Sequence, residues 1–207
     1  MLVPGVFQPQ ELAALHAACD ELLASCGPLV SGNPRIQIEP ETEGWEVPVV
    51  RKLEPVIDMH PALEALAHDA RMKAAAADLL GEEVYLYEDK LNYKPPRIGS
   101  SYPLHQVRSP LTAARRSPLT AARRSAHCAR MWQDRSYWEF LAPGIPSTDK
   151  LITVSLLLDD ATPENGCLRL VPASHHGLME TRVGEKHALK ADLMTAVDAP
   201  GKAGDLL

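Results

Sequence analysis

The sequence contains no stretch that approaches the ~20 consecutive apolar residues of a membrane-spanning helix. Its first residues, Met-Leu-Val-Pro-Gly-Val-Phe, show no basic region followed by a long apolar run, so no secretory signal is predicted. Cys19, Cys26, Cys128 and Cys167 form no Cys-x-x-Cys pair, which favours reduced thiols over a zinc or disulfide role. The net charge of −6 argues against a general affinity for nucleic acid or anionic membranes. We therefore expect a cytoplasmic protein that binds neither.

What the chain does contain is enough for one domain with a sizeable core, since it has 207 residues of which 45% are hydrophobic. A first helix is predicted from Pro9, which suits a first helical position, to Gly27, which ends the pattern. Its apolar residues recur at helical spacing: Leu12, Leu15, Cys19, Leu22, Leu23 and Cys26. A second helical region, rich in Ala and Leu, is predicted over 61–80 with Gly81 as its C-cap.

Short strands are predicted between and after these helices. Residues 36–38 and 47–50 are short alternating pieces separated by proline and glycine, and 84–94 alternates with a period of two until two prolines end it. Residues 151–158 are typical of a buried strand.

The pair Asn165-Gly166 is a tight-turn signal, and it predicts that strand 151–158 forms a hairpin with 167–171. Residues 202–207 resemble a turn that enters a further strand, which we expect to be left incomplete. Helices followed by short strands favour an α+β domain whose β part is a sandwich or jelly roll.

One segment breaks this pattern. Residues 108–115 read Arg-Ser-Pro-Leu-Thr-Ala-Ala-Arg, 116–123 repeat them without change, and a third copy begins at Arg124 and decays. Residues 108–130 hold six arginines and no acidic residue. A unit of eight residues is too short for a solenoid, so we expect 107–131 to be a disordered basic insertion. A basic binding arm, a recent duplication and a reading-frame error in the gene remain alternatives.

Several blocks of residues, taken in order, carry a family resemblance. These are Asp-Lys-Leu-Asn-Tyr-Lys-Pro-Pro at 89–96, Pro-Leu-His-Gln at 103–106, Asp-Asp-Ala-Thr-Pro-Glu-Asn-Gly-Cys-Leu at 159–168, Val-Pro-Ala-Ser-His at 171–175, and Gly-Lys-Ala-Gly-Asp at 201–205. Together they resemble the phytanoyl-CoA dioxygenase family over nearly the whole chain outside the insertion.

The resemblance implies a double-stranded β-helix that binds Fe(II) through two histidines and one carboxylate. Such a facial triad leaves neighbouring positions open for 2-oxoglutarate and O2. The implied activity is hydroxylation of a small organic or acyl substrate. His105 matches the first iron ligand, and Gln106 and Lys94 match positions that hold 2-oxoglutarate in relatives. The resemblance assigns no other catalytic residue.

This chain departs from the family pattern in two places. Val107 stands where the family has the aspartate ligand, and a valine side chain cannot bind iron. The family's distal histidine and 2-oxoglutarate arginine would follow the last residue, so we expect the C-terminal strands to be missing. Asp134, the nearest carboxylate after the insertion, is a weak substitute for the missing ligand.

These departures leave three hypotheses about function. The first is an oxygenase of this family whose activity is impaired in this chain. The second is a non-catalytic pseudoenzyme or binding protein on the same fold. The third, less favoured, is an iron-dependent halogenase, in which a small residue replaces the carboxylate so that chloride can bind iron.

Overall fold

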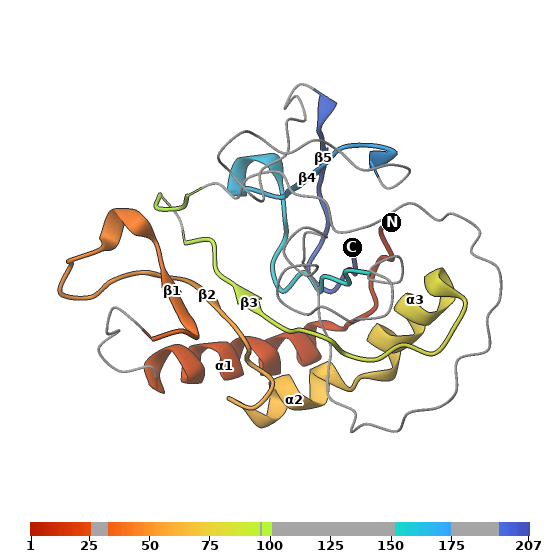
Figure 1. Ribbon diagram of the computed structural model, residues 1–207, viewed down its shortest axis with the longest axis horizontal. Coiled ribbons are helices and arrows are strands. Elements are labelled where there is room, and N and C mark those ends of the chain that lie inside the picture. Colours follow the sequence, from red (N-terminus) through yellow and green to blue (C-terminus); the bar gives the residue numbers. More distant parts are fainter. Residues whose placement is uncertain (26–32, 96, 101–151, 175–194) are drawn as a thin grey trace, which may run out of the picture.

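The computed structural model describes residues 1–25, 33–95, 97–100, 152–174 and 195–207. Within these residues, two helices lie along one side of a three-stranded antiparallel sheet, a third helix lies beyond the end of that sheet, and a two-stranded sheet lies beyond its other side (Figure 1). The helices are α1 (Pro9–Ser25), α2 (Pro61–Ala67) and α3 (Ala70–Leu80). The α+β expectation is therefore confirmed at the level of helices and antiparallel strands.

Helix α1 begins at Pro9, as its sequence predicts. Its buried residues are Leu12, Leu15, Ala18, Cys19 and Leu22, which follow the predicted apolar stripe. Because the pattern is local and repeats every three to four residues, the sequence alone specifies which side of this helix packs inward.

The predicted helical region over 61–80 is divided in two at His68 and Asp69. The carboxylate of Asp69 accepts a hydrogen bond from Arg71 N at 2.8 Å and caps the start of α3. Gly81 ends α3 with a φ of 69°, a left-handed conformation that glycine adopts without steric cost, so its predicted role as C-cap is confirmed.

The larger sheet consists of β1 (Ile36–Ile38), β2 (Val50–Leu53) and β3 (Leu91–Asn92), in that order. Two of its strands differ from their predicted ranges. Strand β2 begins at the residue where the predicted strand at 47–50 ends, and Val47 is exposed. Of the strand predicted over 84–94, Leu91 and Asn92 pair with β2, and Tyr93 N donates to the Arg51 carbonyl at 2.9 Å.

The predicted hairpin around Asn165-Gly166 is wrong. Strand β4 (Leu168–Leu170) pairs instead with β5 (Val197–Ala199), far along the chain. Asn165 ends a short 3-10 helix, η3 (Pro163–Asn165), where its side chain accepts from Thr162 N at 2.8 Å and donates to the Asp160 carbonyl at 2.6 Å. The left-handed turn at Gly166 therefore closes this helix rather than a hairpin.

The segment predicted as a strand at 151–158 pairs with the last residues of the chain. Ser155 and Leu207 exchange two backbone hydrogen bonds of 2.9 Å. Leu206 exchanges bonds of 2.8 and 2.9 Å with Val3 on its other side and is 2% exposed. The turn predicted at 202–205 is thus followed by extended backbone that pairs with Val3 on one side and with Ser155 on the other.

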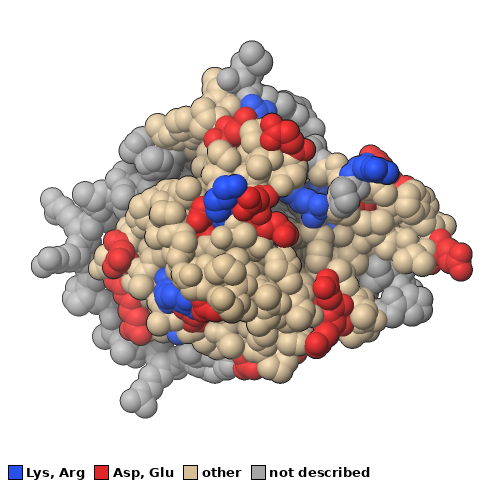
Figure 2. Space-filling model, turned by 180° about the vertical axis from the view of Figure 1, so that it is seen from behind, with Lys and Arg blue, Asp and Glu red and all other residues tan. Residues whose placement is uncertain are grey.

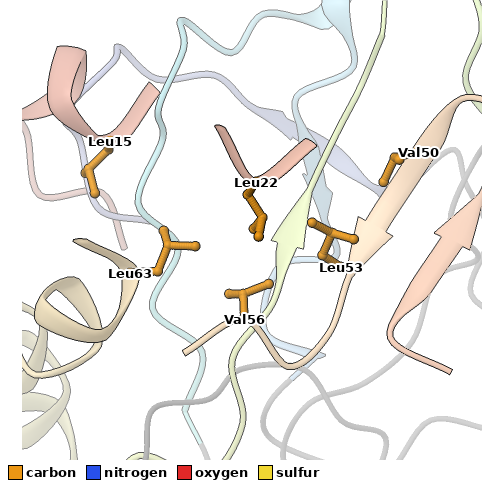
Figure 3. Close-up of a cluster of buried hydrophobic side chains, with 6 residues drawn as sticks. All are labelled: Leu15, Leu22, Val50, Leu53, Val56 and Leu63. Atoms are coloured by element: carbon orange, nitrogen blue, oxygen red, sulfur yellow. The ribbon is translucent and has the colours of Figure 1, made fainter. Parts of the chain in front are cut away.

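The main core lies between the helices and the larger sheet. Six buried side chains from α1, α2 and the β2 region meet there (Figure 3): Leu15, Leu22, Val50, Leu53, Val56 and Leu63. Leu53, one of these six, is 0% exposed. This packing fixes the orientation of β2 and β3 and leaves their other face for polar residues.

Candidate functional site

The structure describes one of the three site residues that the sequence predicts. Lys94 is described, whereas His105 and Gln106 lie outside the described residues. The same is true of Val107, Asp134 and the insertion at 107–131. Their predicted roles stay predictions.

Lys94 lies just beyond β3 and is exposed. Its ammonium donates a hydrogen bond to the carbonyl oxygen of Gly166, at the end of η3. This contact joins the larger sheet to the segment that leads into β4, and both regions meet on the side of β3 away from the helices (Figure 1).

Strand register divides the β2–β3 pair into an apolar and a polar face. Leu53 pairs with Leu91, and both pack into the main core. The neighbouring pair, Lys52 and Asn92, therefore points to the opposite face, since successive side chains alternate along a strand. Lys94, two residues after Asn92, continues this polar face.

Three charged side chains meet at the end of the polar face. The Lys90 ammonium donates to Glu54 Oε1 at 3.2 Å, and the Lys52 ammonium donates to Glu54 Oε2. The side chains of Lys52, Glu54 and Lys90 are 14%, 17% and 9% exposed. Two ammonium groups therefore share one carboxylate in a largely buried setting.

The protonation equilibria of this cluster reflect both burial and neighbouring charge. Burial lowers the pKa of Lys90 to about 8, because the charged form loses its hydration, although Glu54 opposes the shift. Burial alone would raise the pKa of Glu54, but the hydrogen bond from Lys52 and the charge of Lys90 outweigh it and leave that pKa lowered. Glu54 is thus ionised at neutral pH.

Sequence reasoning missed Lys52, Glu54 and Lys90. The available signal was the alternation of polar and apolar residues in Lys-Leu-Glu at 52–54 and Lys-Leu-Asn-Tyr-Lys at 90–94. Alternation places each residue on a face of its own strand, but only the register between strands brings Glu54 and Lys90 together.

Two further blocks of the family resemblance meet in a tightly bonded turn. The Asp205 carboxylate is 4% exposed and accepts hydrogen bonds from Gly5 N and Lys202 N, both at 2.8 Å. Asp160 accepts from Ala203 N at 3.0 Å and from the Lys202 ammonium at 2.6 Å. Asp160 is therefore held by one backbone N–H and by the ammonium of Lys202.

A facial triad of two histidines and one carboxylate needs three donor side chains, and the described residues do not bring three such donors together. Among them, no group of three His, Cys, Asp or Glu side chains could hold a metal ion. Position 107 offers no donor because it is valine. The described residues alone therefore do not fit an iron site.

One face of the molecule carries charge of both signs among its described residues (Figure 2). Acidic and basic side chains lie interspersed on the face seen in Figure 2, rather than gathered by sign. Within the described ranges, no helix is long and apolar enough to cross a membrane. Cys19 and Cys167, the two cysteines among the described residues, are both free and buried.

The chain is similar in sequence to characterised hydroxylases. The profile of the family described as Phytanoyl-CoA dioxygenase (PhyH) matches residues 1–207. The ectoine dioxygenase of Sphingopyxis alaskensis is 28% identical over 185 residues, which are 89% of this chain and 48% of that protein. The methylphosphonate hydroxylase of Gimesia maris is 28% identical over 158 residues, 75% of this chain and 47% of that protein.

The fold is similar to that of EctD from S. alaskensis. Its apoform superposes with a TM-score of 0.66 at 24% identity, covering 100% of this chain and 62% of that one. Its structures with bound Fe and with 2-oxoglutarate and 5-hydroxyectoine give TM-scores of 0.60 and 0.61 at 23% identity, covering 100% of this chain and 62% and 61% of those. This chain spans about half the length of the curated relatives it matches. Because the family profile matches the chain from first residue to last, the chain belongs to the phytanoyl-CoA dioxygenase family.

Proposed function

We propose that this chain carries part of the machinery of an Fe(II)- and 2-oxoglutarate-dependent dioxygenase. The observation that supports this most is the family match over residues 1–207, together with a fold similar to EctD. EctD has been solved with bound Fe and with 2-oxoglutarate, and the proposal extends these two groups to the present chain. Bound Fe(II) would activate O2, which is the oxidant, and the conversion of 2-oxoglutarate to succinate and CO2 would supply the two further electrons that O2 needs when it hydroxylates the substrate.

In this proposal His105 is the iron ligand, and Gln106 and Lys94 hold 2-oxoglutarate. Lys94 suits this role because its flexible stem carries an exposed ammonium, and a carboxylate is a stronger acceptor than the Gly166 carbonyl it now bonds. Binding of the co-substrate would draw the Lys94 ammonium away from Gly166.

The proposed substrate is a small organic or acyl molecule. The relatives are named for ectoine and for methylphosphonate, two compounds that are small and polar. The proposal therefore favours a small polar substrate, with choice between compounds resting on the pocket rather than on the fold.

For the domain organisation, we propose one cytoplasmic domain over 1–207 on a double-stranded β-helix. The basic repeat at 107–131 would be an insertion in it. Support comes from the fold similarity, which covers the whole chain, and from the lack of any second compositional unit outside the repeat.

The test is an anaerobic titration of the 207-residue chain with Fe(II) and 2-oxoglutarate, followed by the visible charge-transfer band of the chelated complex. A saturable band that disappears in His105→Ala is the expected result. A matched control is His68→Ala, which removes a histidine at the end of α2, outside the candidate site. If no band forms at any concentration, this chain does not bind iron and co-substrate together.

The second candidate is a non-catalytic binding protein on the same fold. Val107 favours it, because it removes the carboxylate ligand that the family pattern requires. The two candidates are separated by Val107→Asp. A band that appears only in this variant would assign the loss to that one substitution and support a non-catalytic role for the chain as it stands.

A further inference from the structure

The loop between β1 and β2 presents apolar and acidic side chains together. It projects from one end of the larger sheet (Figure 1), and within it Trp45 is 51% exposed and Val47 is 75% exposed. Three exposed carboxylates lie beside them in the sequence: Glu41, Glu43 and Glu46. Among the ion pairs of the described residues, none engages these three carboxylates, and residues 38–50 hold no basic residue. Exposed apolar side chains with a charged rim are typical of an interaction surface, and we call these five residues the loop surface.

The base of this loop is fixed by buried hydrogen bonds. The Thr42 hydroxyl donates to the Glu39 carbonyl oxygen at 2.8 Å and accepts from Val49 N at 3.0 Å. Thr42 is 0% exposed, and its own carbonyl accepts from Trp45 N at 3.0 Å. The loop surface is therefore formed in advance, so a partner can bind it with little further loss of conformational freedom.

The same base holds the segment that leads to the arginine repeat. The Glu39 carboxylate is buried, and its Oε2 accepts from Ser100 N at 2.9 Å and from Ser100 Oγ at 2.6 Å, across 61 residues of sequence. The repeat begins at Arg108, and the chain between Ser100 and Arg108 can span at most about 28 Å. The repeat is thus tethered beside the loop surface, and so short a tether gives an effective concentration on the order of millimolar.

The repeat complements the loop surface in charge and in chemistry. Residues 108–130 hold six arginines and no acidic residue, and the rest of the chain carries −12, the total of −6 less the +6 of this segment. A guanidinium group pairs with carboxylates in a bidentate manner and stacks on the face of a tryptophan. Each full copy also has one leucine between its arginines, Leu111 or Leu119, which can pack against Val47. A nucleic acid or an anionic membrane, by contrast, would be repelled by the excess negative charge outside the repeat.

We propose that the arginine repeat at 108–130 docks on the loop surface of its own chain. Its arginines pair with the three exposed glutamates, and one of them stacks on Trp45. This docking needs neither iron nor 2-oxoglutarate, so it stands apart from the proposed function. Its consequence is that the bound arginines are withheld from polyanions.

The test is limited digestion of the 207-residue chain by trypsin at low ionic strength, with cleavage after the arginines of the repeat followed by mass spectrometry. Because a protease cuts the undocked state, the rate reports how much of the repeat is free. The combined variant Glu41→Gln, Glu43→Gln, Glu46→Gln should be cut about tenfold faster, since each exposed ion pair contributes about a factor of two. Trp45→Ala should be cut about threefold faster, through the loss of one stacked guanidinium.

The matched control makes the same change of charge on the helices. It combines three substitutions of exposed acidic residues of α1, α2 and α3: Asp20→Asn, Glu64→Gln and Asp78→Asn. Its repeat should be cut at the wild-type rate, and at about 0.5 M NaCl the loop variant should approach that rate as well, because salt screens exposed ion pairs.

Three results would overturn the proposal. The first is equal cleavage rates for the wild type and the loop variant at low ionic strength. The second is protection that disappears on dilution, which would assign the docking to a second copy of the chain. The third concerns a fluorescent single-stranded oligonucleotide, which the loop variant should bind more tightly than the wild type; equally tight binding by both would assign the repeat to an external polyanion.

Discussion

Replacing Asp205 by alanine should destabilise the fold far more than the loss of one surface charge. Its carboxylate accepts bonds of 2.8 Å from Gly5 N and Lys202 N in a place that is 4% exposed. A hydrogen bond to a charged group contributes about 1.5–3 kcal/mol, so losing both should lower the free energy of unfolding by about 3–6 kcal/mol. This is a large part of the roughly 5–15 kcal/mol typical of a domain.

The assay is urea denaturation followed by circular dichroism, with the slope of the transition compared between variants. Asp205→Asn keeps one acceptor oxygen and should lose about half as much stability. The matched control is Asp198→Ala, whose partner Arg169 lies at 3.1 Å and whose side chain is 45% exposed, so it should lose less than about 1 kcal/mol. A loss for Asp205→Ala no greater than that of this control would refute the reasoning.

Four other residues give predictions of the same kind. Gly204→Ala should lower the free energy of unfolding, measured by urea denaturation, by about 3 kcal/mol or more, because φ is +93° and the new Cβ would lie 2.3 Å from the Phe7 carbonyl oxygen. The control is Gly44→Ala, where φ is +88° but the Cβ would meet open space, and the loss should be about 1 kcal/mol. Leu53→Ala should lower the free energy of unfolding by about 3–5 kcal/mol through the cavity it leaves, whereas Leu170→Ala, at a residue 42% exposed, should lower it by less than about 1 kcal/mol. Similar losses for the two variants would contradict the burial of Leu53 in the core. Burial lowers the pKa of folded Lys90 from 10.5 to about 8, so between pH 8 and pH 10.5 the unfolded chain binds one more proton than the folded chain. The free energy of unfolding should therefore rise with pH over this range, by up to about 3 kcal/mol relative to Lys90→Met. Parallel pH profiles of the two proteins would disprove this prediction. Burial raises the pKa of Cys19 to about 11, so iodoacetamide at pH 8 should label it only after unfolding, as read by mass spectrometry of its peptide; rapid labelling of the folded chain would be inconsistent with this packing.

The parts of the fold that the sequence predicts well are those fixed by neighbours along the chain. Helix α1 and the Gly81 cap depend on periodicity and on a single backbone conformation, and both follow from a few adjacent residues. The break between α2 and α3 at Asp69 also has a local cause, since aspartate is a common N-cap. The alanine-rich sequence on both sides of Asp69 favours a continuous helix, so the break was not predicted.

The pairing of strands could not be predicted in the same way. Asn165-Gly166 is a hairpin signal when its two flanks pair, but here each flank finds a distant partner, β5 for one and residues 204–207 for the other. Long-range pairing depends on which faces can be buried together, and that is a property of the assembled core.

The candidate site divides along the same line. Lys94 was predicted from a family block, and the structure gives it a partner, Gly166, that no motif indicates. Lys52, Glu54 and Lys90 form a cluster only through the register between β2 and β3. For His105 and Gln106, the family pattern remains the basis of the prediction.

The pairing of Val3 with Leu206 has a consequence for the order of folding. Phe7 N bonds to the Gly204 carbonyl, and Gly5 N bonds to Asp205, a residue 200 positions away along the chain. Contacts between residues so far apart close a long loop, and their entropic cost is met only after local structure has formed. The segment around Val3 is therefore expected to dock late, after α1 and α2 have packed together.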